Sequence, residues 1–146
     1  MLRSFGIEGF RANIRKVNGH SIMSFYFYNC LTQCIALNNS FAEHIRASPI
    51  FELVTPPSFA LTVFRLLSGS TSDAGQCDGV NAVNREFYRD LQSRSSLVLT
   101  QTLIGEVFCV RLAVGASTTE QRDIEDAWSI IKEVGETTLR RLGYES

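Results

Sequence analysis

The stretch "EVFCVRLAVGAS", residues 106–117, alternates like a β-strand and carries one charge in its middle. Successive side chains of a strand point to opposite faces. One face of this stretch is wholly apolar and consists of Phe108, Val110, Leu112 and Val114. The other face holds Arg111 among the small apolar side chains of Val107, Cys109 and Ala113. Because a guanidinium is always ionised, the role of Arg111 on that face decides how the rest of the chain is interpreted.

Outward from this strand, the pattern predicts four strands and four helices. The strands are expected at 50–54, 59–67, 96–102 and 106–114, and the helices at 8–16, 34–48, 79–94 and after Ser117. A short turn joins the first two strands and another joins the last two, so both pairs are predicted to be antiparallel hairpins. We therefore expect an α+β fold in which a four-stranded antiparallel sheet carries helices on one face.

Local signals place the ends and the buried faces of the two long helices. Asp78 is expected to cap the third helix, whose apolar stripe is Val80, Val83, Phe87 and Leu91. Ser117 and Glu120 have the spacing of a capping box for the last helix. Its predicted buried face is Ile124, Ala127, Trp128, Ile131, Val134, Leu139 and Leu142. Gly135 interrupts that helix and is expected to weaken it by roughly 1 kcal/mol relative to alanine.

Composition is that of one soluble domain. The chain has 146 residues, of which 45% are hydrophobic and 20% charged, and a net charge of -1, so no strong field attracts it to nucleic acid or a membrane. Its four cysteines form no CxxC pair, which favours reduced thiols and a cytoplasmic location. The N-terminus lacks the apolar region of a signal peptide, and no apolar run is long enough to span a membrane.

Three long segments of the chain carry a family resemblance. They are "LRSFGIEGFRANIRK", "FAEHIRASPIFELVTPPSFALTVFRL" and "LTQTLIGEVFCVRLAVGASTTEQRDIEDAW". Together they resemble the C-terminal small domain of group II pyridoxal-phosphate-dependent amino-acid decarboxylases, fold-type I enzymes, and among these the aromatic-L-amino-acid, tyrosine and tryptophan decarboxylases. The resemblance covers residues 1–146 as one domain, except 17–33 and the loop 68–79. It implies a carboxy-lyase that converts an L-amino acid to its amine, works as a homodimer and uses pyridoxal 5'-phosphate.

The family's cofactor chemistry, however, depends on a large domain that is missing from this chain. The resemblance implies that the large domain supplies a lysine, directly after a histidine, for the Schiff base with the cofactor. The two lysines here, Lys16 and Lys132, follow Arg15 and Ile131 instead. His20 and His44 have no partner at metal-ligand spacing. We therefore expect no catalytic, cofactor-binding or metal-ligating residue in this chain, and an isolated chain that is inactive.

Two arginines are candidate site residues because of the resemblance. It implies that Arg111 faces the catalytic cleft and helps to place a carboxylate, which suits the two parallel hydrogen bonds of a guanidinium. The alternative is a structural ion pair between Arg111 and a carboxylate of a neighbouring domain or helix. Arg3 lies in "RSFG", which matches the segment that links the two domains, so it is either a residue of the domain seam or a solvated arginine.

The stretch "VNGHSIMSFYFYNCLTQ", residues 17–33, interrupts the resemblance. Without this stretch, "ANIRK" joins "CIALNNSFAEHIRA" into one long helix. When the stretch is present, we expect Gly19 and an uncharged aromatic run of high β propensity to break that helix. We hypothesise a translated intron of about fifty nucleotides, because valine codons can start with a GT donor, CAG encodes glutamine, and Phe and Tyr codons are rich in pyrimidines. The alternative is a genuine surface insertion.

A second function class stays open at this stage. The chain is also consistent with a non-catalytic module that pairs with a full-length decarboxylase by mimicking its small domain. Co-purification with a full-length homologue would distinguish the two hypotheses. If Arg111 has only an enzyme role, Arg111→Ala should lower activity in a full-length context without lowering stability. In neither reading do we expect nucleic acid or a membrane as a partner.

Overall fold

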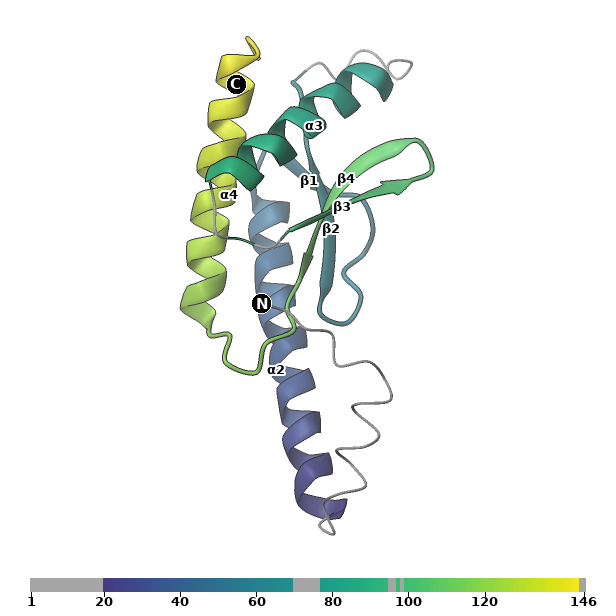
Figure 1. The fold of residues 1–146 in the computed structure, drawn as a ribbon, viewed down its shortest axis with the longest axis vertical. Coiled ribbons are helices and arrows are strands. Elements are labelled where there is room, and N and C mark those ends of the chain that lie inside the picture. The colour runs from purple at the N-terminus through teal and green to yellow at the C-terminus, as the bar shows by residue number, and fades with distance from the viewer. Residues whose placement is uncertain (1–19, 70–76, 95–96, 98, 145–146) are drawn as a thin grey trace. The chain divides into compact units, whose positions relative to one another are not determined.

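The computed structural model of the chain describes residues 20–69, 77–94, 97 and 99–144. Its elements in chain order are α2 (His20–Ala47), β1 (Phe51–Leu53), β2 (Leu61–Leu66), α3 (Cys77–Arg94), β3 (Thr100–Ile104), β4 (Val107–Ala113) and α4 (Gln121–Arg141) (Figure 1). The chain divides into two compact units, Met1–Gln33 and Cys34–Ser146. The helix predicted at 8–16 lies outside the described residues.

The four strands form one antiparallel sheet in the order β1-β2-β4-β3. This confirms the α+β fold and the two predicted hairpins. The β3–β4 hairpin turns over two residues, since Ile104 pairs with Val107. Gly105 begins this turn with φ +61°, a left-handed conformation that glycine adopts without strain. The described strand β3 starts at Thr100, which pairs with Arg111. The predicted start at residue 96 lies outside the described residues.

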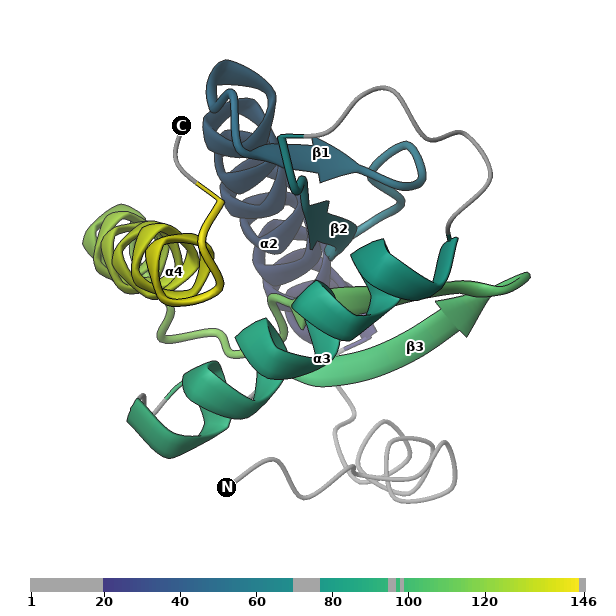
Figure 2. The ribbon, with the colours of Figure 1, turned by 90° about the horizontal axis from the view of Figure 1, so that it is seen from above.

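Five aromatic rings from five elements form the centre of the core in Cys34–Ser146. Phe51 of β1 lies 6.1 Å from Phe64 of β2, 5.7 Å from Phe87 of α3 and 5.5 Å from Trp128 of α4, measured between ring centroids. Phe41 of α2 lies 5.6 Å from Phe64. Most of these pairs meet edge to face, the arrangement that ring quadrupoles favour. α3 runs across β4 and β2 and packs against α4 (Figure 2).

Two buried asparagines join α3 to the sheet. Asn84 accepts a hydrogen bond from the Leu66 N–H at 2.7 Å and donates one to the Leu66 carbonyl at 2.9 Å. Asn81 accepts from the Phe108 N–H at 2.8 Å and donates to the Glu106 carbonyl at 2.7 Å. Each amide thus satisfies a donor and an acceptor of the sheet backbone that would otherwise be costly to bury. No local sequence pattern indicates either role.

The structure corrects both predicted helix starts. α3 begins at Cys77, so Asp78 lies inside its first turn and not before the helix. α4 begins after Glu120, whose N–H donates to the Asp123 carboxylate at 2.8 Å. The capping box is therefore formed by Glu120 and Asp123, and the predicted pairing of Ser117 with Glu120 is wrong. The Asp123 carboxylate satisfies the Glu120 N–H, which has no partner within the helix. In the predicted capping box, the Ser117 hydroxyl would have bonded to this same N–H.

Gly135 has a packing role that the sequence analysis did not predict. The buried face of α4 is largely as expected, but it also includes Gly135 and Thr138, while Leu142 lies beyond the helix and is 36% exposed. A Cβ on Gly135 would lie 2.5 Å from the Phe51 ring and 3.1 Å from a methyl group of Leu66. The missing side chain therefore lets α4 approach the sheet closely, which offsets the weaker helix propensity of glycine.

The described part of 17–33 is helical, which contradicts the break expected at the aromatic run. The break expected at Gly19 lies outside the described residues. α2 runs without interruption from His20 to Ala47, and it ends two residues before Pro49, near the predicted end. The aromatic run therefore does not break the helix, because a helix contains all its backbone hydrogen bonds and residues 34–47 already provide a nucleus to extend. No helix in the described part of the chain is long and apolar enough to cross a membrane.

Candidate functional site

Arg111 lies on the face of β4 opposite to the buried side chains of Val110 and Leu112. It is exposed on β4, directly opposite Thr100 of β3 and Val63 of β2. Its Nε donates a hydrogen bond to the Thr100 Oγ1 at 3.0 Å. Among the described residues, no carboxylate forms an ion pair with Arg111. The cation is therefore oriented by a neutral hydroxyl and stays available to an anion.

A second arginine on the same face is already neutralised. Arg65 of β2 lies two residues after Val63, so it shares the face of Arg111. It pairs with Glu52, its direct partner on β1, through a hydrogen-bonded ion pair. Because of this pair, Arg65 offers no free charge to a ligand. The sequence signal for this ion pair was one charged residue in each of two largely uncharged strands. The pair was not predicted.

Cys109 is close to both arginines but is not a reactive thiol. It is fully buried, and its Sγ lies 3.3 Å from the Val107 carbonyl oxygen, which accepts its weak hydrogen bond. Burial raises the pKa of the Cys109 thiol, and the nearby charge of Arg65 lowers it by less. A neutral buried thiol is a poor nucleophile. This confirms the interpretation of Cys109 as a small core residue.

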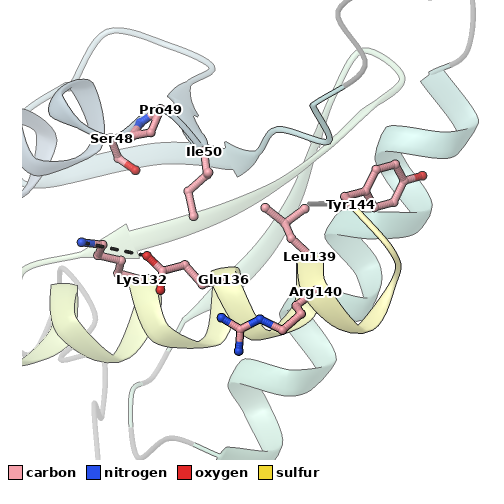
Figure 3. A pocket seen from close by; sticks show the side chains of 8 residues that line it. All are labelled: Ser48, Pro49, Ile50, Lys132, Glu136, Leu139, Arg140 and Tyr144. Atoms are coloured by element: carbon pink, nitrogen blue, oxygen red, sulfur yellow. Dashed lines mark ion pairs between the residues drawn. The ribbon is translucent and has the colours of Figure 1, made fainter. Parts of the chain in front are cut away.

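A separate pocket of about 540 Å³ lies between α4 and the residues that precede β1 (Figure 3). Its lining consists of Ser48, Pro49, Ile50, Lys132, Glu136, Leu139, Arg140 and Tyr144. The Ser48 hydroxyl oxygen is buried and has no hydrogen-bond partner in the described part of the chain. The charged side chains of the pocket are all exposed, and Lys132 lies 4.0 Å from the Glu136 carboxylate. Arg111 does not line this pocket.

The described residues do not fit pyridoxal phosphate. A Schiff base requires an amine held in place to attack a carbonyl. The side chain of Lys132 is 53% exposed and paired with Glu136, so it is neither positioned nor shielded from water. Within the same residues, no group of three His, Cys, Asp or Glu side chains could hold a metal ion. Arg3 and Lys16 lie outside the described residues.

Comparison with known proteins identifies relatives over nearly the whole chain. No family model matches. The chain is 29% identical over 149 residues to a tyrosine decarboxylase of Oryza sativa, a match that covers 98% of the chain and 25% of the relative. It is 30% identical over 139 residues to the tryptophan decarboxylase TDC2 of Camptotheca acuminata, with 95% of the chain and 24% of the relative covered.

Solved structures of such enzymes contain the same fold. The crystal structure of Oryza sativa TDC with PLP and tryptamine aligns with a TM-score of 0.68 and 28% identity, over 76% of this chain and 23% of that one. Catharanthus roseus tryptophan decarboxylase in complex with L-tryptophan aligns with a TM-score of 0.66 and 29% identity, over 75% and 22% of the two chains. The chain thus spans about a quarter of the relatives that it matches. With its sheet, its helices and these relatives, the chain matches the C-terminal small domain of the group II pyridoxal-phosphate-dependent amino-acid decarboxylases.

Proposed function

We propose that this chain is part of a pyridoxal-phosphate-dependent carboxy-lyase that converts an aromatic L-amino acid to its amine and carbon dioxide. The relatives are decarboxylases of tyrosine and tryptophan, and two of the aligned structures hold tryptamine or L-tryptophan. The observation that carries the proposal is Arg111, exposed on β4 with no carboxylate partner in the described part of the chain. As in the family, we expect a homodimer of the complete enzyme.

Arg111 is proposed to line the cleft and to hold a carboxylate there. Its Nε is occupied by Thr100, which fixes the plane of the guanidinium. The terminal nitrogens can then donate two parallel hydrogen bonds to a carboxylate. Decarboxylation requires the bond to the departing carboxylate to be held in one orientation, and a bidentate clamp provides such an orientation. If the clamped group belongs to the cofactor domain instead of the substrate, Arg111 stabilises the contact between the domains.

The cofactor, when bound to the complete enzyme, would withdraw electrons from the bond that breaks. The residues that hold it are proposed to lie in the large domain, since Lys132 does not fit that role. An isolated chain is accordingly proposed to neither bind the cofactor covalently nor decarboxylate. Arg3 is proposed to lie at the seam between the two domains. Cys30 and Cys109 are free thiols, which is compatible with the proposed cytoplasmic location.

Residues 17–33 are proposed to be a translated intron. The stretch interrupts the family resemblance between Lys16 and Cys34, and this interruption supports the proposal. The helical conformation of His20–Gln33 is also compatible with a genuine insertion that extends α2. Only the transcript distinguishes the two.

The decisive experiment is to sequence the transcript from upstream of Met1 through residue 50 and to assay the complete reading frame. We expect an upstream large domain with a His-Lys pair, and release of carbon dioxide from tyrosine, tryptophan or dopa. A frame that starts at Met1 and retains codons 17–33 would contradict the proposal. The chain would then be a non-catalytic module, and co-purification with a full-length decarboxylase would be its test.

A further inference from the structure

The pocket between α4 and the residues that precede β1 combines an apolar lining with exposed charges (Figure 3). Pro49, Ile50 and Leu139 supply the apolar part, and the Leu139 side chain is buried. The pocket volume of about 540 Å³ falls within the range of about 300–1,000 Å³ that is typical of small-molecule sites. No residue of β4 lines the pocket, so it is separate from the cleft proposed for Arg111.

Three charged side chains of α4 line the pocket and leave it with one unmatched positive charge. Lys132, Glu136 and Arg140 are spaced four residues apart, so they lie on one side of the helix. The Lys132 Nζ lies 4.0 Å from the Glu136 carboxylate, and these two charges offset each other. Arg140 forms no ion pair with any described residue. Its planar guanidinium can therefore donate two parallel hydrogen bonds to a carboxylate.

The C-terminal end of α4 does not cancel this positive charge. A helix C-terminus carries the equivalent of about half a negative charge, which is less than the full charge of a guanidinium. The last carbonyls of α4 are also partly satisfied. The Leu139 carbonyl accepts a hydrogen bond from the Tyr144 N–H at 2.9 Å, and the Arg140 carbonyl accepts one from the Gly143 N–H at 3.2 Å. The pocket thus favours an anion at Arg140.

A buried hydroxyl group in the pocket lacks a hydrogen-bond partner. The Ser48 Oγ is buried and forms no hydrogen bond with any described residue, although the Ser48 N–H donates to the Ile45 carbonyl at 3.2 Å. Buried polar atoms nearly always have a partner, which is supplied by the protein, by ordered water or by a ligand. The Ser48 hydroxyl is therefore a second, independent sign that the pocket is occupied in solution.

We propose that this pocket binds a small organic monocarboxylate that has an apolar body. The carboxylate pairs with Arg140, and the apolar body packs against Ile50 and Leu139. A dianion such as phosphate is disfavoured, because the pocket offers one unmatched cation and the Glu136 carboxylate repels further negative charge. An organic cation is disfavoured because the lining has a net positive charge. The site lies within this chain and does not depend on the proposed decarboxylase activity.

The test uses 3-phenylpropionate as the probe, which is titrated into the purified, 15N-labelled chain and followed by NMR. We expect saturable binding with a Kd of about 1 mM, as for a fragment-sized ligand, and shifts of the Ser48, Ile50 and Arg140 amide signals. Two comparison probes each lack one interaction: 3-phenylpropylamine has the same body with the opposite charge, and acetate has the charge without the body. Each should bind at least about tenfold more weakly.

Two matched variants test the role of the guanidinium. Arg140→Gln removes the unmatched cation and should weaken the binding of 3-phenylpropionate at least about fivefold. Arg122→Gln is the control, because Arg122 is another exposed arginine of α4 but does not line the pocket. This control should bind the probe like the unchanged chain. Both side chains are exposed, so both variants should keep the fold, and circular dichroism checks this.

Three outcomes would overturn the proposal. The absence of saturable binding would mean that the pocket does not take a monocarboxylate. Equal affinity for 3-phenylpropylamine would mean that the apolar lining binds without regard to charge. Unchanged binding to Arg140→Gln, together with a loss of binding in Arg111→Gln, would place the carboxylate at Arg111 and not in this pocket. Unchanged binding in both variants would also exclude Arg140 as the carboxylate partner.

Discussion

Arg111 of β4 donates its Nε hydrogen to the Oγ1 of Thr100 across the β3–β4 pair, over 3.0 Å. This hydrogen bond occupies one edge of the guanidinium and leaves its two terminal nitrogens without an ion-pair partner in the described part of the chain. Arg65 on the same face is neutralised by Glu52. The two arginines therefore differ in what they can do, although both stand in the middle of apolar strands.

Replacing Arg111 separates a ligand-binding role from a structural one. In this chain, we expect Arg111→Ala to change the free energy of unfolding by less than about 0.5 kcal/mol, because the side chain is exposed. In the complete enzyme we expect kcat/KM to fall by about ten- to a hundredfold, as for a lost charge-assisted pair. Arg111→Lys keeps the charge but not the planar fork, so it should recover only part of the activity. Chemical denaturation and steady-state kinetics measure the two effects. Strong destabilisation with unchanged activity would assign Arg111 to a structural ion pair.

Removing the Asn84 amide should destabilise the fold strongly. Asn84→Leu leaves both the N–H and the carbonyl of Leu66 buried without their side-chain partner, which we expect to cost about 3 kcal/mol. Urea denaturation measures this loss. Asn39→Ala is the matched control, since Asn39 is exposed on α2, and its effect should stay within about 0.5 kcal/mol. Equal effects of the two variants would show that the bonds to Leu66 contribute little.

Two glycines should respond to alanine in opposite ways. Gly135→Ala places a methyl group 2.5 Å from the Phe51 ring and should destabilise the chain by about 1–3 kcal/mol. Gly79→Ala adds a methyl group to α3 with nothing within 4 Å, and should stabilise it by up to about 1 kcal/mol. Thermal unfolding followed by circular dichroism compares them. If Gly135→Ala also raised the Tm, the contact between α4 and β1 would be looser than the structure indicates.

Asp90 makes the stability of the α3–α4 contact dependent on pH. Burial raises the pKa of Asp90, but hydrogen bonds from Thr138 at 2.8 Å and Arg141 at 2.8 Å outweigh it, so the pKa lies below its ordinary value. A carboxyl whose pKa is lowered by folding stabilises the fold above its unfolded pKa of about 3.9 and loses that contribution as the pH falls towards the folded pKa. Denaturation at several pH values should show a fall in stability below about pH 4 that is smaller in Asp90→Asn. An identical fall in both proteins would assign the acid sensitivity to other carboxyls.

Local patterns predicted those parts of the fold that depend on neighbouring residues. Alternation in 106–114 identified the two faces of β4, and Pro49 correctly indicated where α2 ends. The hairpins followed from short turns. These features depend on residues only a few positions apart, so a sequence displays them directly. The cleft-lining role that the resemblance implies for Arg111 stays a prediction. Element boundaries were less accurate, as the shifted start of α4 shows, because competing caps decide it.

The sequence by itself therefore determined the order of the elements, the apolar face of each and the family that the chain resembles. Only the tertiary structure decided that Gly135 leaves space for the Phe51 ring, that the Asn84 amide accepts a hydrogen bond from the buried Leu66 N–H, and that Glu52 pairs with Arg65. It also decided that the aromatic run of 20–33 is helical, against its local β propensity. The physical reason is the same in each case. The roles of Gly135, Asn84 and Glu52 arise from contacts between groups far apart in the chain, and the helical form of 20–33 arises because the adjacent residues 34–47 already form a helix. No local pattern encodes either effect.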